Sequence, residues 1–325
     1  MKTGKSSPVN LYQRLLAEAD LQGFPLANAI DTDGAPSERD IQAYDQWLAN
    51  GSAGEMQYLK RGRDRRTDLK LVYPETQSIL CVALPYDARA VGSKDTVRYA
   101  RYLRGRDYHT EIAERLETLM RKIADDFPDL KWKVCVDTSG ILERHWAARA
   151  GLGWIGKNTM LIHPQYGSYL LLGEVLLNQQ VGNEGTTLKD YCGHCTRCVE
   201  ACPTQAISDN RILESTRCIS YWTLEKRGDL ALEPKQEKAI SNWVAGCDIC
   251  QEVCPFNTKA NVRWEIEAPN EILSKAGAVA ATDWDALARE TLFEYKIRVR
   301  DSSLNRVKPE MFKRNLMIAQ KNKAR

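Results

Sequence analysis

The sequence predicts a mixed fold, described as α+β or α/β, in which a domain of helices and strands precedes a cysteine-rich unit and a helical end. Three short apolar runs indicate buried strands: residues 78–84, 132–136 and 169–177. A helical pattern covers residues 110–127, between the first two strands. Eight cysteines then lie between Tyr191 and Pro255, where little room is left for an ordinary core.

The chain of 325 residues exceeds one average domain, so we expect three units. Residues 11–47 have helical spacing interrupted by a turn at 31–36, which predicts an α-rich start. The composition changes at Gly182, and helical spacing returns after Asn257. These changes predict an α/β domain, a cysteine-rich domain and a helical, basic segment at residues 1–181, 182–260 and 261–325.

Composition excludes several classes of protein. The 46 Lys and Arg nearly balance the 43 Asp and Glu, so any attraction to nucleic acid must come from local patches. No apolar run approaches the roughly 20 residues of a membrane span. The first residues lack the pattern of an export signal. We therefore expect a cytoplasmic protein without membrane contact, whose clustered thiols hold metal rather than form disulfides.

The cysteine spacing specifies the kind of metal site. The first block runs C-x2-C-x2-C-x3-C-P from Cys192 to Pro203, which is the spacing of bacterial ferredoxins with two 4Fe-4S clusters. In that spacing the fourth cysteine binds the other cluster. The predicted ligands of cluster one are Cys192, Cys195, Cys198 and Cys254, and those of cluster two are Cys202, Cys218, Cys247 and Cys250.

Zinc is the alternative, because four-cysteine zinc sites also use C-x2-C pairs. Zinc does not explain why the x3-C-P ending occurs twice, at Pro203 and at Pro255. The remaining Cys81 and Cys135 lie inside apolar strands, where a free cysteine behaves as a small hydrophobic residue.

A second chemical segment surrounds Asp137, directly after a predicted strand. A carboxylate at a strand end is placed for chemistry in open α/β sheets, but it can equally cap the next helix. The glycines at 151, 153 and 156 do not follow a strand, so they do not predict a dinucleotide site. They favour close approach of a bulky flat ligand, with polar contacts from Lys157, Asn158, Ser168 and Tyr169.

Nearly the whole chain resembles the epoxyqueuosine reductases. The resemblance rests on GEMQYL at 54–59, RYLRGRDYH at 101–109, VDTSGILER at 136–144, AGLGWIGKNT at 150–159, GSYLLLGE at 167–174 and RCISYWTLE at 217–225. It implies a nitroreductase-like cobalamin-binding domain and a two-cluster ferredoxin domain. The implied reaction reduces epoxyqueuosine to queuosine at the wobble position of tRNA, the last step of queuosine synthesis.

The resemblance also implies roles for particular residues. Low-potential electrons pass through the clusters to cobalamin, and Asp137 supplies the proton, for which burial must keep it protonated near neutral pH. No cobalamin-binding motif that contains histidine is present, so no protein imidazole is expected on cobalt; His109 and His145 are expected to be structural. The expected cofactor contacts are Met56, Tyr99, Asp137, Thr138, Lys157, Asn158, Ser168, Tyr169 and Ser220.

The expected partners are a tRNA anticodon stem-loop and an external low-potential electron donor, and we expect a monomer. Two basic clusters, at residues 60–66 and 98–106, suit an unstacked RNA loop, although charge runs are more often solvated faces. The expected RNA contacts are Arg101, Arg106, Lys226, Arg227 and Arg298.

Two features depart from the family pattern. Gly140 stands where many relatives have proline, and relatives often carry helical repeats beyond the equivalent of residues 314–316, whereas this sequence stops at Arg325. Two other functions remain open, an electron-transfer protein without its own substrate and a cytoplasmic cobalamin enzyme related to reductive dehalogenases.

Overall fold

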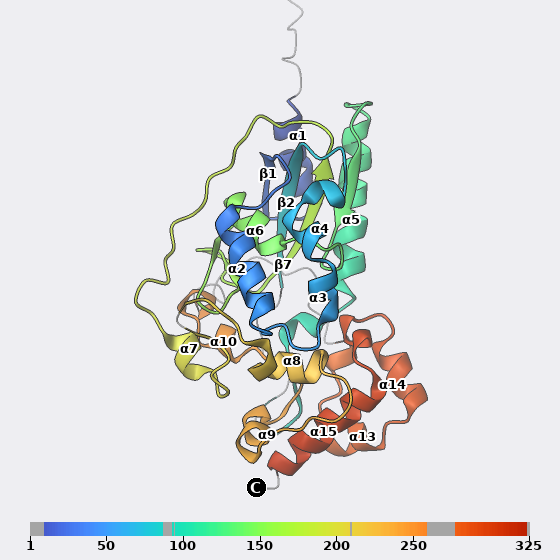
Figure 1. The fold of residues 1–325 in the computed structure, drawn as a ribbon. Helices are drawn as coiled ribbons and strands as arrows, with labels where there is room; N and C mark the ends of the chain where they lie inside the picture. Colours follow the sequence, from blue (N-terminus) through green and yellow to red (C-terminus); the bar gives the residue numbers. More distant parts are fainter. Residues whose placement is uncertain (1–9, 87–92, 94, 209, 259–276, 324–325) are drawn as a thin grey trace, which may run out of the picture.

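The structure is a computed structural model that describes residues 10–86, 93, 95–208, 210–258 and 277–323. A sheet flanked by helices forms one half of the molecule, and the last helices of the chain form the other (Figure 1). Part of the predicted third unit, residues 261–276, lies outside the described residues.

The main sheet has four strands in the order β1-β2-β7-β4, and every neighbouring pair is antiparallel. Its strands are β1 (Leu26–Asp31), β2 (Ser78–Pro85), β4 (Trp132–Cys135) and β7 (Leu170–Leu177). The three predicted strands are confirmed as β2, β4 and β7. The prediction missed β1, because alanine, asparagine and aspartate have low strand propensity and β1 forms through its pairing with β2.

Helices cover both faces of this sheet. Alternate residues of β2 point to opposite faces, so that Leu80 and Val82 pack with α1 (Leu11–Leu21) and α5 (Tyr108–Ala124). The other face packs against α6 (Glu143–Arg149), whose Trp146 is fully buried. Gly173 of β7 allows α5 to approach closely, since a Cβ atom there would lie 2.6 Å from Ile112.

Shorter elements complete this half. Three helices follow β1: α2 (Glu38–Ala49), α3 (Gln57–Arg61) and α4 (Arg63–Thr67). The glycine-rich segment after α6 forms a small hairpin from β5 (Trp154–Ile155) and β6 (Leu161–Ile162). Single 3-10 turns lie at Leu69–Leu71, Arg101–Leu103, Ser215–Arg217, Gly277–Val279 and Ser303–Arg306.

The other half joins the cysteine-rich segment to the end of the chain. Its elements are β3 (Arg98–Tyr99), α7 (Arg197–Ala201), α8 (Ile219–Leu224), α9 (Pro234–Ile240), β8 (Trp243–Ala245), α10 (Ile249–Glu252), α13 (Trp284–Arg289), α14 (Leu292–Val299) and α15 (Pro309–Lys323). β3 pairs in parallel with β8, and residues 97–103 share a core with α13, α14 and α15. Buried Asn315 of α15 donates hydrogen bonds to the carbonyls of Thr223 and Val244 at 2.9 Å. Segments far apart in sequence therefore form this half together, and the predicted domain limits remain a prediction.

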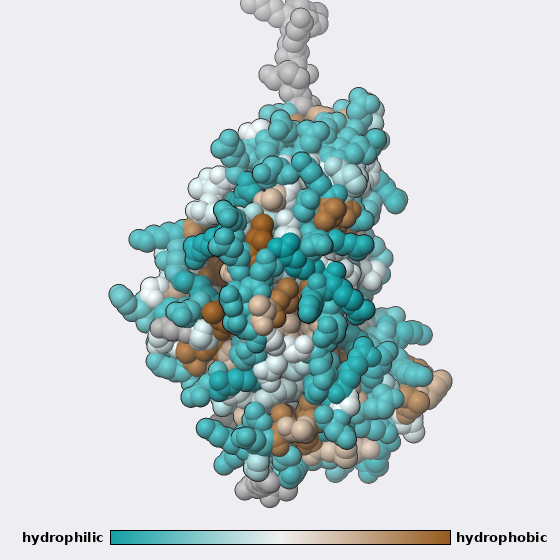
Figure 2. Space-filling model, viewed as in Figure 1, coloured by the Kyte–Doolittle hydropathy of each residue, from teal (hydrophilic) through white to brown (hydrophobic). Residues whose placement is uncertain are grey.

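The surface is mostly polar, with isolated apolar areas (Figure 2). One of these areas lies on α14, where Leu292, Phe293 and Ile297 are exposed. No helix within the described ranges is both long and apolar enough to cross a membrane.

Candidate functional site

Four cysteines from the two sequence blocks come together beside the small hairpin. The thiol of Cys254 interacts electrostatically with Cys192 and Cys195, and the thiol of Cys198 interacts with Cys192 and Cys254. The indole N–H of Trp154 donates a hydrogen bond to the Cys192 sulfur at 3.4 Å. These are the four residues predicted to bind cluster one, and Cys254 joins them although it lies more than 50 residues further along the chain.

The other four cysteines form a second group, at the end of α7 and at the starts of α8 and α10. Cys218 interacts electrostatically with Cys202, and Cys250 interacts with both of them. Burial, followed by the charge of Cys250 and Cys218, raises the pKa of Cys247 well above its ordinary value. Cys250 also interacts with Cys198 of the first group, so the two groups are adjacent.

The arrangement suits clusters rather than single ions. Among the described residues, no three cysteine, histidine or carboxylate side chains converge closely enough to bind one metal ion. A 4Fe-4S cubane binds its four cysteines through separate iron atoms, so its ligands surround the cluster instead of meeting at a point. Eight cysteines in two adjacent groups of four fit two such clusters.

Asp137 lies on a strained turn two residues after β4. Its backbone φ is 50°, in the left-handed region that residues other than glycine adopt uncommonly and aspartate more readily than most. One carboxylate oxygen is 3.1 Å from Nε2 of His109, and Nδ1 of His109 is 2.6 Å from Asp107 at the start of α5. On the other side, the backbone N–H of Asp137 donates a hydrogen bond to the Glu143 carboxylate at 2.5 Å.

The charges around Asp137 contradict the expectation that it is protonated near neutral pH. The Asp137 side chain is 43% exposed, so its burial is only partial. Partial burial raises the pKa of the Asp137 carboxyl, but the hydrogen bond from His109 and the charges of His109, Arg306 and Arg144 outweigh it and lower that pKa. Burial lowers the pKa of His109, yet its two aspartate partners raise the pKa to about 9. Without ligands the pair is therefore an aspartate and an imidazolium.

Asp137 faces the cysteine-rich half of the molecule. Arg306, whose charge acts on Asp137, forms an ion pair with Glu225 at the end of α8. Helix α8 begins directly after Cys218. The hydroxyl of Tyr221 in α8 accepts a hydrogen bond from the Glu55 backbone at 2.8 Å, which fixes α8 against the loop that precedes α3. The second cysteine group is thus attached to the surroundings of Asp137.

Sequence reasoning missed two carboxyl groups beside Asp137. Burial and the charge of Asp137 raise the pKa of Glu143 to about 7. Burial, and then the charges of Glu143 and Asp137, raise the pKa of Glu174 well above its ordinary value. A signal for Glu174 was present in the sequence, since it is the single charged residue in the strand LLLGEVLL.

The predicted cofactor contacts differ in how accessible their side chains are. Asn158 is buried, and within the described chain its side-chain N–H group has no hydrogen-bond partner, so it can bind a polar ligand atom. Lys157, Met56 and Ser220 are half-buried, and Thr138 is exposed beside Asp137. Met56, Ser220 and Thr138 can be reached by a ligand, and the role of Lys157 stays a prediction.

Three other predicted contacts stay predictions, and their side chains are buried and engaged within the protein. Tyr99 is 1% exposed, donates its hydroxyl to the Ala281 carbonyl at 2.9 Å and stacks on Phe312. Buried Ser168 is held by Asn257 and Gln251, and buried Tyr169 packs edge-on against Tyr86. Their side chains hold segments together and do not line an open site.

Two of the predicted RNA contacts stay predictions, but their side chains already form ion pairs within the protein. Arg101 is 7% exposed and contacts Asp248 at 3.0 Å and Glu252 at 2.9 Å. The guanidinium of Arg298 binds Glu290 at 2.6 Å and the Ala278 carbonyl at 2.7 Å. Since Asp248 lies between Cys247 and Ile249, Arg101 fixes the second cysteine block to the rest of the protein.

The other three predicted RNA contacts lie nearer the surface. Arg106 is part-exposed and paired with Glu114 at 3.0 Å, and Lys226 is paired with Glu55. Arg227 is exposed.

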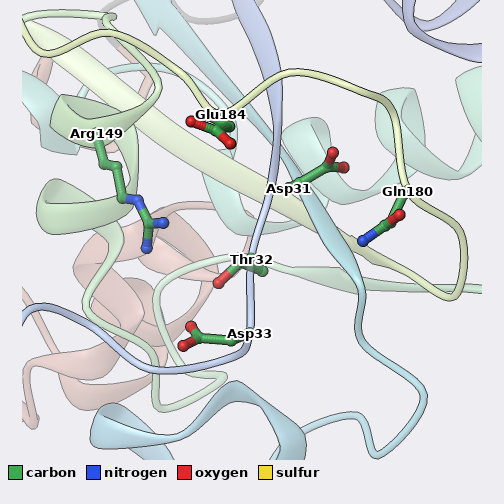
Figure 3. A pocket seen from close by; sticks show the side chains of 6 residues that line it. All are labelled: Asp31, Thr32, Asp33, Arg149, Gln180 and Glu184. Carbon is green, nitrogen blue, oxygen red and sulfur yellow. The ribbon is translucent and has the colours of Figure 1, made fainter.

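A surface hollow of about 430 Å³ lies elsewhere (Figure 3). It is lined by Asp31, Thr32, Asp33, Arg149, Gln180 and Glu184. Asp31 pairs with Ser78, at the end of the sheet opposite Asp137, and its carboxylate accepts hydrogen bonds from the backbone of residues 181 and 182. None of its lining residues belongs to the candidate site, and we assign no role to this hollow.

Comparisons with known proteins agree with this geometry. A family model described as a 4Fe-4S double cluster binding domain matches residues 191–257, and a model described as epoxyqueuosine reductase QueG matches residues 66–138. An epoxyqueuosine reductase from Synechococcus sp. (strain RCC307) is 36% identical over 95% of this chain and 93% of that protein. One from Gloeobacter violaceus is 36% identical over 90% of each chain.

Solved structures give the same result. A crystal structure of epoxyqueuosine reductase with an epoxyqueuosine-modified tRNA-Tyr stem loop has a TM-score of 0.85 and 27% identity, and the match covers 97% of this chain and 82% of that one. The Bacillus subtilis enzyme, with the catalytic loop that carries an aspartate swung out of its active site, has a TM-score of 0.83. The fold and the site define an iron–sulfur oxidoreductase with two 4Fe-4S clusters. The chain belongs to the epoxyqueuosine reductase family.

Proposed function

We propose that this protein reduces epoxyqueuosine to queuosine at the wobble position of tRNA, with electrons supplied one at a time through its two clusters. The observation that carries the proposal is the position of Asp137. It is held on a strained turn between His109 and Glu143, where the sheet meets the half that contains the cysteines. An electron-transfer protein without its own substrate would have no use for this arrangement.

The proposed ligands follow the two cysteine groups. Cluster one takes Cys192, Cys195, Cys198 and Cys254, and cluster two takes Cys202, Cys218, Cys247 and Cys250. Helix α8 begins directly after the cluster-two ligand Cys218 and ends at the Glu225–Arg306 ion pair, whose arginine acts on Asp137. We therefore propose that an external low-potential donor passes electrons first to cluster one.

We infer that the two-electron step uses cobalamin, held between the sheet and α8. Bound there, cobalamin would supply the redox chemistry that joins single electrons into a two-electron reduction. The unpaired side-chain N–H of Asn158 suits an amide on the corrin edge. Lys157, Thr138, Met56 and Ser220 offer further contacts. His109 and His145 both bind carboxylates, so we expect no imidazole on the cobalt.

The residues around Asp137 supply protons to the reaction. Loss of the epoxide oxygen as water consumes two electrons and two protons. Asp137 is placed to give a proton to the departing oxygen, and imidazolium His109 at 3.1 Å can return one to it. A bound cofactor and substrate would exclude water from Asp137 and so favour its protonated form.

Mass spectrometry of the RNA product tests the function directly. The protein with both clusters and cobalamin is reduced and incubated with an anticodon stem-loop that carries epoxyqueuosine. We expect a product that has lost one oxygen atom. An unchanged RNA mass, with fully reduced clusters, would reject the function.

We propose that the RNA binds over exposed cations around the Asp137 turn. Arg65 is a neighbour of Gly140 in this turn, and the Lys226–Glu55 ion pair holds Arg227 beside the loop that leads into α3. Lys60 and Arg61 of α3 are exposed as well. Phosphate groups of an RNA loop would meet positive charge on two sides of the site.

Charge reversal of this surface is expected to weaken RNA binding. The variants Arg65→Glu and Arg227→Glu should each lower affinity and reduce the slope of log affinity against log salt by about 0.7 per lost phosphate contact. Fluorescence anisotropy at several salt concentrations measures both quantities. Lys133 is an exposed residue of β4, and Lys133→Glu is the control for a change of net charge. An equal loss in the control would show that the surface is not specific.

A further inference from the structure

Glu174 is a carboxyl group in a place where carboxyl groups are costly. It is fully buried in β7, a strand of otherwise apolar residues, and neither of its oxygens has a hydrogen-bond partner among the described residues. Burial of an unpaired carboxylate is strongly unfavourable, so such a group stays protonated. A hydrophobic residue of similar size would pack there without that cost, which suggests a use for the proton.

The neighbours of Glu174 do not neutralise a negative charge. In the sheet register, Glu174 lies between Cys81 of β2 and Cys135 of β4. Glu143 from α6 and Asp137 from the turn after β4 act on it electrostatically, and both disfavour its ionised form. Glu18 of α1 provides a contrast: it is equally buried, but it is paired with Arg14 and Lys122.

The three carboxyl groups form a row that leads from the sheet interior to the candidate site. Glu174 is on the sheet face that α6 covers, and Glu143 is the first residue of α6. The Glu143 carboxylate accepts the Asp137 backbone N–H, and the Asp137 carboxylate contacts His109. Arg144 and His109 also act on Glu143. Asp137 therefore has the protonated imidazole of His109 on one side and the interacting carboxyl groups of Glu143 and Glu174 on the other.

We propose that Glu174 and Glu143 store a proton and pass it to Asp137 during the reaction. This inference rests on the proposed function, which breaks two C–O bonds, takes two electrons from the external donor and releases the oxygen as water with two protons. His109 supplies one proton through Asp137 from the open side. The Glu174–Glu143 pair supplies the other from the buried side through bridging water, because the described residues show no hydrogen bond between the carboxyl groups of the row. The pair is refilled from solvent after turnover.

The two glutamates act through Asp137 and do not touch the substrate. Coupled groups hold protons as a pair, so the pair retains one proton over the pH range in which Glu143 alone would lose its own. A store of this kind delivers a proton when water is excluded from the site by the bound RNA.

Infrared spectroscopy tests the stored proton without any turnover. The full-length protein with its clusters, free of substrate, is compared with Glu174→Gln at about pH 8, roughly one unit above the pKa of about 7 of Glu143. We expect the C=O band of a protonated carboxyl group in the first protein and its loss in the variant. If the band is absent from the unmodified protein, Glu174 is ionised and the store does not exist.

The pH dependence of single-turnover rates tests the transfer. Glu174→Gln should match the unmodified protein about one unit below the Glu143 pKa and be about tenfold slower one unit above it, where only about a tenth of Glu143 is protonated. Glu143→Gln should be slow at both pH values. Glu117→Gln, a carboxyl-to-amide change on α5 outside the row, is the matched control.

The outcomes separate a structural role from proton storage. If the single-turnover rates of Glu174→Gln and the unmodified protein change with pH in the same way, the proposed proton transfer is wrong. The cluster absorbance and the circular dichroism of each variant show whether it is folded. If no protein in the series removes oxygen from the RNA, the proposed function fails, and the infrared band still decides whether Glu174 stores a proton.

Discussion

Asp137→Asn is expected to keep the fold, the clusters and bound cobalamin, and to slow loss of oxygen from the RNA by about 10²–10⁴-fold. Asparagine has the same shape as aspartate, and its side-chain oxygen can still accept a hydrogen bond from His109. It cannot carry a proton to the departing oxygen. Single-turnover mass spectrometry of the RNA measures the effect, and the ultraviolet and visible absorbance of the protein reports cofactor content.

Asp40→Asn is the matched control for this prediction. Asp40 of α2 contacts Nδ1 of His145 at 2.6 Å, so it forms a second aspartate–histidine pair, which has no described contact with Asp137. Its replacement should change the rate little. Full activity of Asp137→Asn would remove Asp137 from the chemistry, and equal losses in both variants would indicate a general effect on folding.

The parts of the protein that the sequence predicted well depend on local spacing. The block from Cys192 to Cys202 contains four ligand positions within 11 residues, so its spacing predicts the type of cluster without knowledge of the fold. The strands β2 and β7 were predicted because continuous apolar runs need burial on both faces. The family resemblance rested on similar short segments.

The features that the sequence did not predict depend on residues that are distant in the chain. Arg101 is 147 residues from Asp248, and no local pattern shows that a surface-like arginine is buried in an ion pair. His109 is 28 residues from Asp137, and its position at the start of α5 decides the ionisation of that carboxyl group. The sheet is antiparallel, whereas the strand-end argument for Asp137 assumed the parallel sheets of α/β folds. The strand-end argument therefore selected Asp137, although the rule behind it does not apply to an antiparallel sheet.

Replacement of Cys250 by alanine is expected to stop electron flow to the site and abolish turnover. Cys250 lies where the two cysteine groups meet, since it interacts with Cys202, Cys218 and Cys198. Loss of cluster two should lower the iron content from about eight to about four atoms per chain. Cluster one should remain reducible. Iron analysis and electron paramagnetic resonance of the reduced protein measure both effects, and Cys81→Ala, at a buried cysteine in β2, should keep all the iron.

The crossed assignment makes a sharper prediction for Cys254. Cys254 follows Cys250 by four residues, yet its electrostatic partners Cys192 and Cys195 belong to the other group. Cys254→Ala should therefore lose cluster one and leave the same residual spectrum as Cys192→Ala, and not that of Cys250→Ala. A residual spectrum like that of Cys250→Ala would mean that each sequence block binds its own cluster. Because Cys250 lies in α10 and Cys254 follows the end of that helix by two residues, the crossed arrangement ties the two clusters together through one short segment, so they stay close enough to exchange electrons.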